Sequence, residues 1–151
     1  MKRRLLLLQL IALCTFGIVS ALGHGQAETG PNGGRILEFS KDESVHGELT
    51  VKDGKFHIAL LDKAMKPIAI KEQTLTITTG DRDKPEKLAV QKEGDQFVAP
   101  AVQAGQWAIF QFRQTAKAKP VTARVEYDTK ECGECKKPEW LCSCGREQVG
   151  K

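Results

Sequence analysis

The chain reads Glu48-Leu49-Thr50-Val51-Lys52-Asp53-Gly54-Lys55-Phe56-His57-Ile58, in which apolar and polar side chains alternate on both sides of Asp53-Gly54. This period of two is typical of β-strands, whose successive side chains point to opposite faces. Asp-Gly suits a two-residue type I′ turn, because both central positions of that turn need a positive φ. We therefore predict a β-hairpin in which Val51 lies opposite Phe56 and Leu49 lies opposite Ile58.

The same alternation extends from about Arg35 to Tyr127, interrupted by short segments rich in Gly, Pro and Asp. No stretch of this region combines a helix cap with an apolar stripe. Seven or eight short strands at this spacing are typical of an immunoglobulin-like β-sandwich. The sequence therefore predicts an all-β domain over residues 35–128. A flexible segment rich in Gly, Pro and Asn is expected before it, over residues 24–34.

Residues 1–23 have the pattern of a signal peptide. A basic start, Met1-Lys2-Arg3-Arg4, precedes a mostly apolar run over residues 5–19 that is too short to span a bilayer comfortably. Small residues follow, and cleavage after Ala21, Gly23 or Ala27 fits the pattern equally well. We therefore expect a protein of the periplasm or the exterior, with no membrane span once the signal is removed.

The charge of the chain depends on this signal. The full sequence carries a formal net charge of +4, from 23 basic and 19 acidic residues. Removal of residues 1–23 takes away Lys2, Arg3 and Arg4, which leaves 20 basic against 19 acidic residues, or +1. A surface on which positive and negative charges are mixed is not expected to form the basic patch that binds nucleic acid. Nucleic acid is therefore not an expected partner.

A cysteine-rich tail over residues 129–151 follows the predicted sandwich. Its only bulky apolar residues are Trp140, Leu141 and Val149, so burial alone is not expected to order it. Four thiolates in so short a segment can close a tetrahedral site for Zn(II), and Cys-x-Cys spacing also suits Cu(I). The candidate ligands are Cys132, Cys135, Cys142 and Cys144.

Two other interpretations of the tail stay open. An oxidising compartment favours two disulfides, and they would have to join the two halves of the tail because a Cys142–Cys144 bridge would be strained. Alternatively, Cys132-Gly133-Glu134-Cys135 is similar to a redox dithiol, but that chemistry requires a helix N-terminus that the sequence does not indicate.

The histidines offer one further candidate ligand. In the predicted hairpin, His46 and His57 lie four residues apart along the sheet, which at roughly 3.3 Å per residue is too far for one ion. We predict that both are surface residues. His24 differs, because cleavage after Ala21 or Gly23 would place it at or near a free N-terminus that can chelate Cu(II) or Ni(II). Cleavage after Ala27 would discard it.

Three segments of the chain, residues 30–37, 48–56 and 104–108, resemble small exported β-sandwich proteins associated with bacterial heavy-metal and copper efflux. The likeness spans residues 24–127 and leaves the cysteine tail outside. Members commonly carry a histidine-rich segment before Gly-Pro-x-Gly-Gly, whereas this chain has only His24-Gly25 there. The resemblance implies a sandwich fold, a role in metal tolerance, and an envelope efflux or resistance protein as partner.

Taken with the tail, these patterns predict an exported metal-binding protein that holds Zn(II) or Cu(I) through four thiolates. The alternative is a disulfide-stabilised interaction module without metal. No nucleophile elbow, phosphate loop or cluster of histidines with carboxylates at catalytic spacing is present in the sequence, so an enzyme is not expected.

Overall fold

The computed structural model describes residues 27–144. The predicted signal peptide and His24 lie outside the described residues. Within them the chain forms nine strands and one short 3-10 helix, η1. The elements are β1 (Arg35–Glu38), β2 (Val45–Lys52), β3 (Lys55–Asp62), β4 (Thr74–Asp81), β5 (Lys84–Lys87), β6 (Gln91–Glu93), β7 (Gln96–Pro100), β8 (Trp107–Arg113), β9 (Val121–Glu126) and η1 (Glu139–Leu141).

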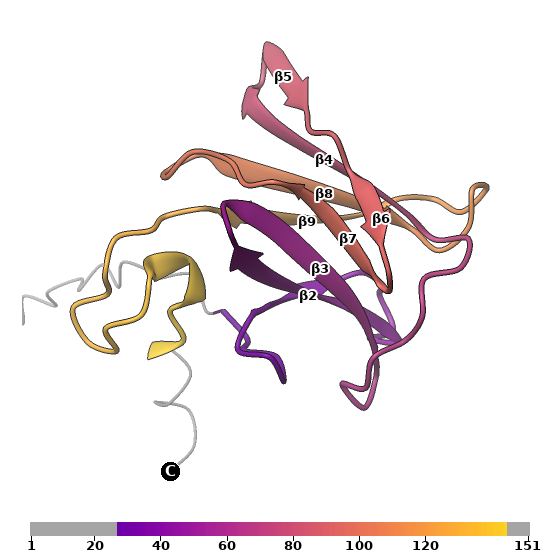
Figure 1. Ribbon diagram of the computed structural model, residues 1–151, viewed down its shortest axis with the longest axis horizontal. Helices are drawn as coiled ribbons and strands as arrows, with labels where there is room; N and C mark the ends of the chain where they lie inside the picture. Colours follow the sequence, from indigo (N-terminus) through magenta and orange to yellow (C-terminus); the bar gives the residue numbers. More distant parts are fainter. Residues whose placement is uncertain (1–26, 145–151) are drawn as a thin grey trace, which may run out of the picture.

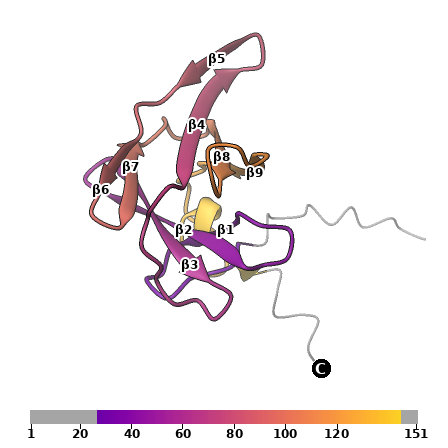
Figure 2. The same ribbon diagram turned by 90° about the vertical axis from the view of Figure 1, so that its right-hand side faces the viewer.

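The strands form two antiparallel sheets, ordered β1-β2-β3-β7-β6 and β5-β4-β8-β9, which Figures 1 and 2 show as two layers. With β2 as strand A, β2-β3-β7-β6 follows the immunoglobulin order A-B-E-D, and β5-β4-β8-β9 follows C′-C-F-G. β1 is an additional strand beside A. The predicted immunoglobulin-like sandwich is therefore confirmed. The strands exceed the predicted number because β5 and β6 are short, exposed and polar, without an apolar alternation.

The predicted hairpin forms with the predicted register. Asp53 and Gly54 have φ of 51° and 71°, as the type I′ turn requires. Val51 lies opposite Phe56, and Leu49 lies opposite Ile58. Leu49, Phe56 and Ile58 are fully buried, so this face of β2 and β3 forms one wall of the core.

Aromatic rings connect the core from one sheet to the other. Phe110 of β8 packs against Phe56 of β3, with ring centroids 5.9 Å apart. The Phe56 ring meets Tyr127 edge to face at 5.3 Å, and Tyr127 in turn contacts Trp140 at 5.5 Å. Tyr127 follows β9 and Trp140 lies in η1, so this row of rings leads from the centre of the sandwich into the tail.

His46 corrects one sequence prediction. It was expected at the surface but is only 4% exposed, because β1 lies beside β2 and the outer face of this sheet is covered there. Its Nδ1 lies 3.1 Å from Glu38 Oε2 on β1. On its other side is Leu61 of β3, itself fully buried and bridged to Pro67 of the next loop. His57 is partly buried, and its Nδ1 lies 3.2 Å from Gln96 Oε1.

The segment before β1 is a hydrogen-bonded loop built around Glu48. This carboxylate is 1% exposed and accepts hydrogen bonds from the Asn32 amide and Nδ2, both at 2.7 Å, and from the Gly34 amide at 3.0 Å. A side chain at Gly34 would collide with the backbone oxygen of Leu49, which explains the glycine. The expectation of a flexible segment over 24–34 did not anticipate these contacts of residues 27–34.

Replacing Glu48 by Ala should lower the free energy of unfolding by about 3 kcal/mol, because three donors lose a buried charged acceptor. Urea unfolding followed by circular dichroism measures this loss. Glu126→Ala removes an exposed carboxylate from β9 and serves as the control, with an expected change within about 0.5 kcal/mol. Equal effects of the two changes would contradict a structural role for the buried carboxylate.

Within residues 27–144, no helix is long and apolar enough to cross a bilayer.

Candidate metal centre

The tail is docked on the sandwich through Trp140. This side chain is 5% exposed and belongs to the hydrophobic core, contrary to the expectation that burial would not order the tail. The Trp140 amide donates to the Asp128 oxygen at 3.0 Å, and its own oxygen accepts from Arg35 Nη1 at 2.9 Å. The Ala27 amide donates to the Cys142 oxygen at 3.0 Å. The tail therefore lies against the N-terminal segment at one end of the sandwich (Figure 1).

A tight turn positions the first cysteine pair. The Cys132 amide donates to the Lys137 oxygen at 2.8 Å, and the Lys136 amide donates back to the Cys132 oxygen at 3.1 Å. Lys136 has a φ of 60°, so the chain reverses directly after Cys135. This reversal keeps both side chains of the Cys-x2-Cys pair on one side of the turn, as a metal knuckle requires.

The 3-10 helix η1 returns the chain to that pair. Pro138 forms a β-bridge with Glu131, and the Cys142 amide closes the helix by donating to the Glu139 oxygen at 3.0 Å. Trp140 fixes the buried side of η1. Cys142 and Cys144, which follow η1, are thereby brought back to the Cys-x2-Cys pair.

The four sulfur atoms form a compact cluster. All four Sγ atoms lie within 4.8 Å of one another. Cys132 Sγ is 3.3 Å from Cys142 Sγ and 3.7 Å from Cys144 Sγ. A tetrahedral zinc ion with bonds of about 2.3 Å separates its sulfur ligands by about 3.8 Å, whereas a disulfide requires about 2.05 Å. The cysteines are free, and they lie close enough together to bind a metal ion.

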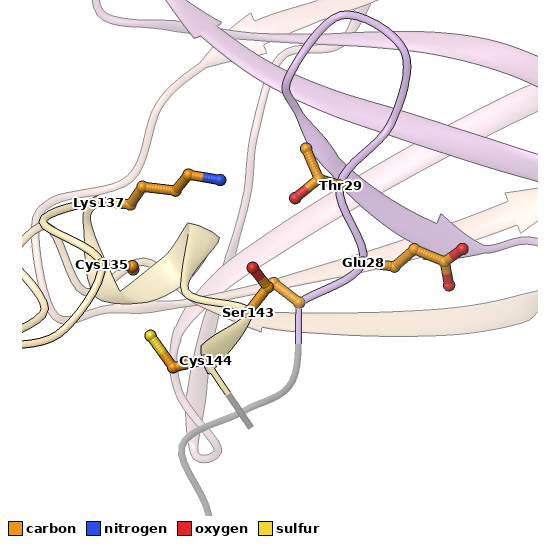
Figure 3. A pocket seen from close by; sticks show the side chains of 7 residues that line it. Glu28, Thr29, Cys135, Lys137, Ser143 and Cys144 are labelled. Atoms are coloured by element: carbon orange, nitrogen blue, oxygen red, sulfur yellow. The ribbon is translucent and has the colours of Figure 1, made fainter. Parts of the chain in front are cut away.

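The cluster is closed on one side and open on the other. Cys132 and Cys142 are 4% and 1% exposed, whereas Cys135 and Cys144 are partly exposed. The latter two border an open cavity of about 500 Å³ between the tail and the N-terminal segment (Figure 3). Its lining consists of Ala27, Glu28, Thr29, Cys135, Lys137, Ser143 and Cys144.

The thiols titrate as a connected group. Hydrogen bonds from the amides of Cys135 and Glu134, and from the Cys142 thiol, lower the pKa of Cys132 to about 7. The pKa of Cys142 is raised, since burial and the neighbouring thiols outweigh the lowering effect of the Cys144 amide. The Cys142 and Cys135 thiols raise the pKa of Cys144. The Cys132 thiolate therefore forms before those of Cys142 and Cys144, and a bound cation would favour ionisation of these two.

Zinc binding should release more protons at pH 6 than at pH 8. Protons and metal compete for the same sulfur, so metal affinity falls as the pH is lowered. Between these pH values the Cys132 thiol, with its pKa of about 7, regains its proton, and the number of protons released on binding should rise by about one. Calorimetric titrations in buffers of different ionisation enthalpy measure this number. An equal release at both pH values would contradict the titration of Cys132 in the site.

The structure brings four of the five sequence-predicted ligands together, while His24 lies outside the described residues. His46 and His57 do not belong to the cluster. Among the lysines of the tail, Lys136 pairs with Glu131 at 3.6 Å and Lys137 lines the cavity. Sequence reasoning missed Ala27 and Arg35, whose hydrogen bonds hold the tail.

Comparisons of the chain with protein-family models, curated proteins and solved structures found no match.

Proposed function

We propose that this is an exported, non-enzymatic metal-binding protein that holds Zn(II) or Cu(I) through Cys132, Cys135, Cys142 and Cys144. The observation that carries the proposal is the clustering of four Sγ atoms within 4.8 Å of one another. Thiolate sulfur is the ligand shared by both ions, which separates them from Mg(II) and Ca(II).

Export and a role in metal tolerance complete the proposal. The signal-like pattern of residues 1–23 supports export to the periplasm or exterior. The resemblance of residues 24–127 to exported proteins of heavy-metal efflux supports metal tolerance and an envelope efflux or resistance protein as partner. A half-open site suits an ion that is exchanged, because a purely structural site is usually closed on all sides.

A disulfide-stabilised interaction module is the second candidate. It is favoured by the 3.3 Å separation of Cys132 and Cys142 Sγ, a pair that a small movement would join. In that case Cys135 and Cys144 would form the second bridge, and no ion would be bound. An oxidising compartment favours this chemistry.

Native and denaturing mass spectrometry of the protein purified from the envelope separate the two candidates. We expect one bound ion under native conditions and four free thiols after its removal. A mass lower by four hydrogen atoms, without bound metal, would refute the metal centre and support the disulfide module. The same spectrum reports the mature N-terminus, so a chain that retains residues 1–23 would refute export with cleavage.

A further inference from the structure

The four sulfur ligands are unequally accessible. Cys132 and Cys142 are covered by the tail and the sandwich, at 4% and 1% exposure. Cys135 and Cys144 lie side by side at the edge of the open cavity (Figure 3). Among residues 27–144, an ion held by all four sulfurs would therefore be most open to an incoming ligand on the side of Cys135 and Cys144.

The cavity has the size and charge to select such a ligand. Its volume of about 500 Å³ falls within the range of small-molecule sites. Figure 3 shows the Lys137 side chain reaching from the tail toward Thr29, whereas the Glu28 carboxylate points away from the two cysteines. Lys137 is exposed and lines the cavity together with Cys135 and Cys144, so its positive charge is available to a ligand that enters the cavity.

From this arrangement we infer that the cavity is an exchange port, that is, the opening through which a small anionic thiol reaches the ion held by the four cysteines and removes it by ligand exchange. The inference rests on the proposed metal site and adds its route of exchange and the class of molecule that acts there. Soft sulfur competes with the Cys ligands for Zn(II) or Cu(I). Negative charge on the thiol is attracted by Lys137.

The step is a ligand exchange in which no electrons change hands. The incoming thiol loses its proton and its sulfur forms a bond to the ion. The bond from the ion to Cys144 or Cys135 breaks, and the released thiolate takes up the proton. Repetition at the second exposed cysteine leaves the ion attached to Cys132 and Cys142 and to the incoming sulfurs. The two buried bonds break last.

Filling the cavity tests the route. The full zinc-loaded protein is mixed without oxygen with excess dimercaptosuccinate, and protein-bound zinc is followed after rapid gel filtration. Thr29 is exposed and Ser143 is partly exposed, so Thr29→Trp and Ser143→Trp add bulk to the cavity without replacing a sulfur ligand. Each change should slow zinc transfer about tenfold at unchanged zinc content, which corresponds to about 1.4 kcal/mol in the barrier.

Gln114→Trp introduces the same side chain at an exposed position of the β8–β9 loop, at the opposite end of the sandwich (Figure 1), and should leave the transfer rate unchanged. Transfer rates equal to wild type in both Thr29→Trp and Ser143→Trp would overturn the port.

Replacing Lys137 tests the preference for negative charge. Lys137→Gln should slow transfer to dimercaptosuccinate about fivefold at low salt while leaving transfer to the neutral dithiol dithiothreitol unchanged. Lys92→Gln, on β6, is the matched control. Equal slowing with both dithiols, or no slowing with either, would refute selection by charge. A protein that binds neither Zn(II) nor Cu(I) would refute the proposed function itself, and the metal content of the starting sample reveals this separately.

Discussion

Replacing Cys142 and Cys144 together by Ser should lower zinc affinity by about four orders of magnitude. Structural zinc sites supply roughly 10–16 kcal/mol of binding free energy at neutral pH, so the loss of two of four ligands costs about 6 kcal/mol. Serine preserves the size of the side chain but offers a hydroxyl that does not ionise at this pH. The remaining pair, Cys132 and Cys135, holds zinc only weakly. Competition with a chromophoric chelator measures the affinity.

Ser143→Ala is the control for that double variant. Ser143 stands between the two replaced cysteines but contributes no sulfur. Its removal should change zinc affinity less than about threefold. Unchanged metal content in the double variant would refute a four-thiolate site.

Trp140→Ala should lower the free energy of unfolding by about 4 kcal/mol, the typical cost of truncating a buried Trp. Trp140 is 5% exposed and ends the row of aromatic rings that runs through Tyr127 to Phe56. Its loss opens a cavity at the end of the core and removes the packing that places η1. We therefore expect weaker zinc binding as well, because ordering of the tail must then be driven by the ion alone.

The second tryptophan of the chain supplies a matched comparison. Trp107 on β8 is 50% exposed, and Trp107→Ala should change the free energy of unfolding by less than about 1 kcal/mol. Urea unfolding followed by far-ultraviolet circular dichroism avoids dependence on tryptophan fluorescence. Similar losses in the two variants would contradict the docking of the tail through Trp140.

The hairpin of β2 and β3 could be predicted because its determinants are local. Asp53-Gly54 fixes the turn, and the alternation of Leu49, Val51, Phe56 and Ile58 fixes which side chains face the core. The cluster of four cysteines could be predicted for the same reason, since its ligands come from one short segment. Spacing alone could not distinguish which sulfurs are buried.

Three features could not be predicted because they depend on contacts with other elements of the fold. His46 has a polar side chain on a predicted outer face, but it is buried where β2 lies between β1 and Leu61 of β3. Glu48 looks like an ordinary surface carboxylate until the loop at Asn32 and Gly34 closes over it. Trp140 stands in a polar tail, and its burial depends on Tyr127 reaching it from the end of β9. The partners of Glu48 and Trp140 lie outside any one turn or hairpin, whereas Glu38 and His46 face each other within the β1–β2 hairpin.

The contact between the tail and β1 has a consequence for the order of folding. The hydrogen bond from Arg35 to the Trp140 oxygen joins residues that are 105 positions apart in the chain. Contacts of such long sequence separation must await the loop closures between them, and they are expected to form late. A nascent chain could complete its hairpins before the last cysteine is synthesised. The docking of the tail on the sandwich would then be the final step of assembly.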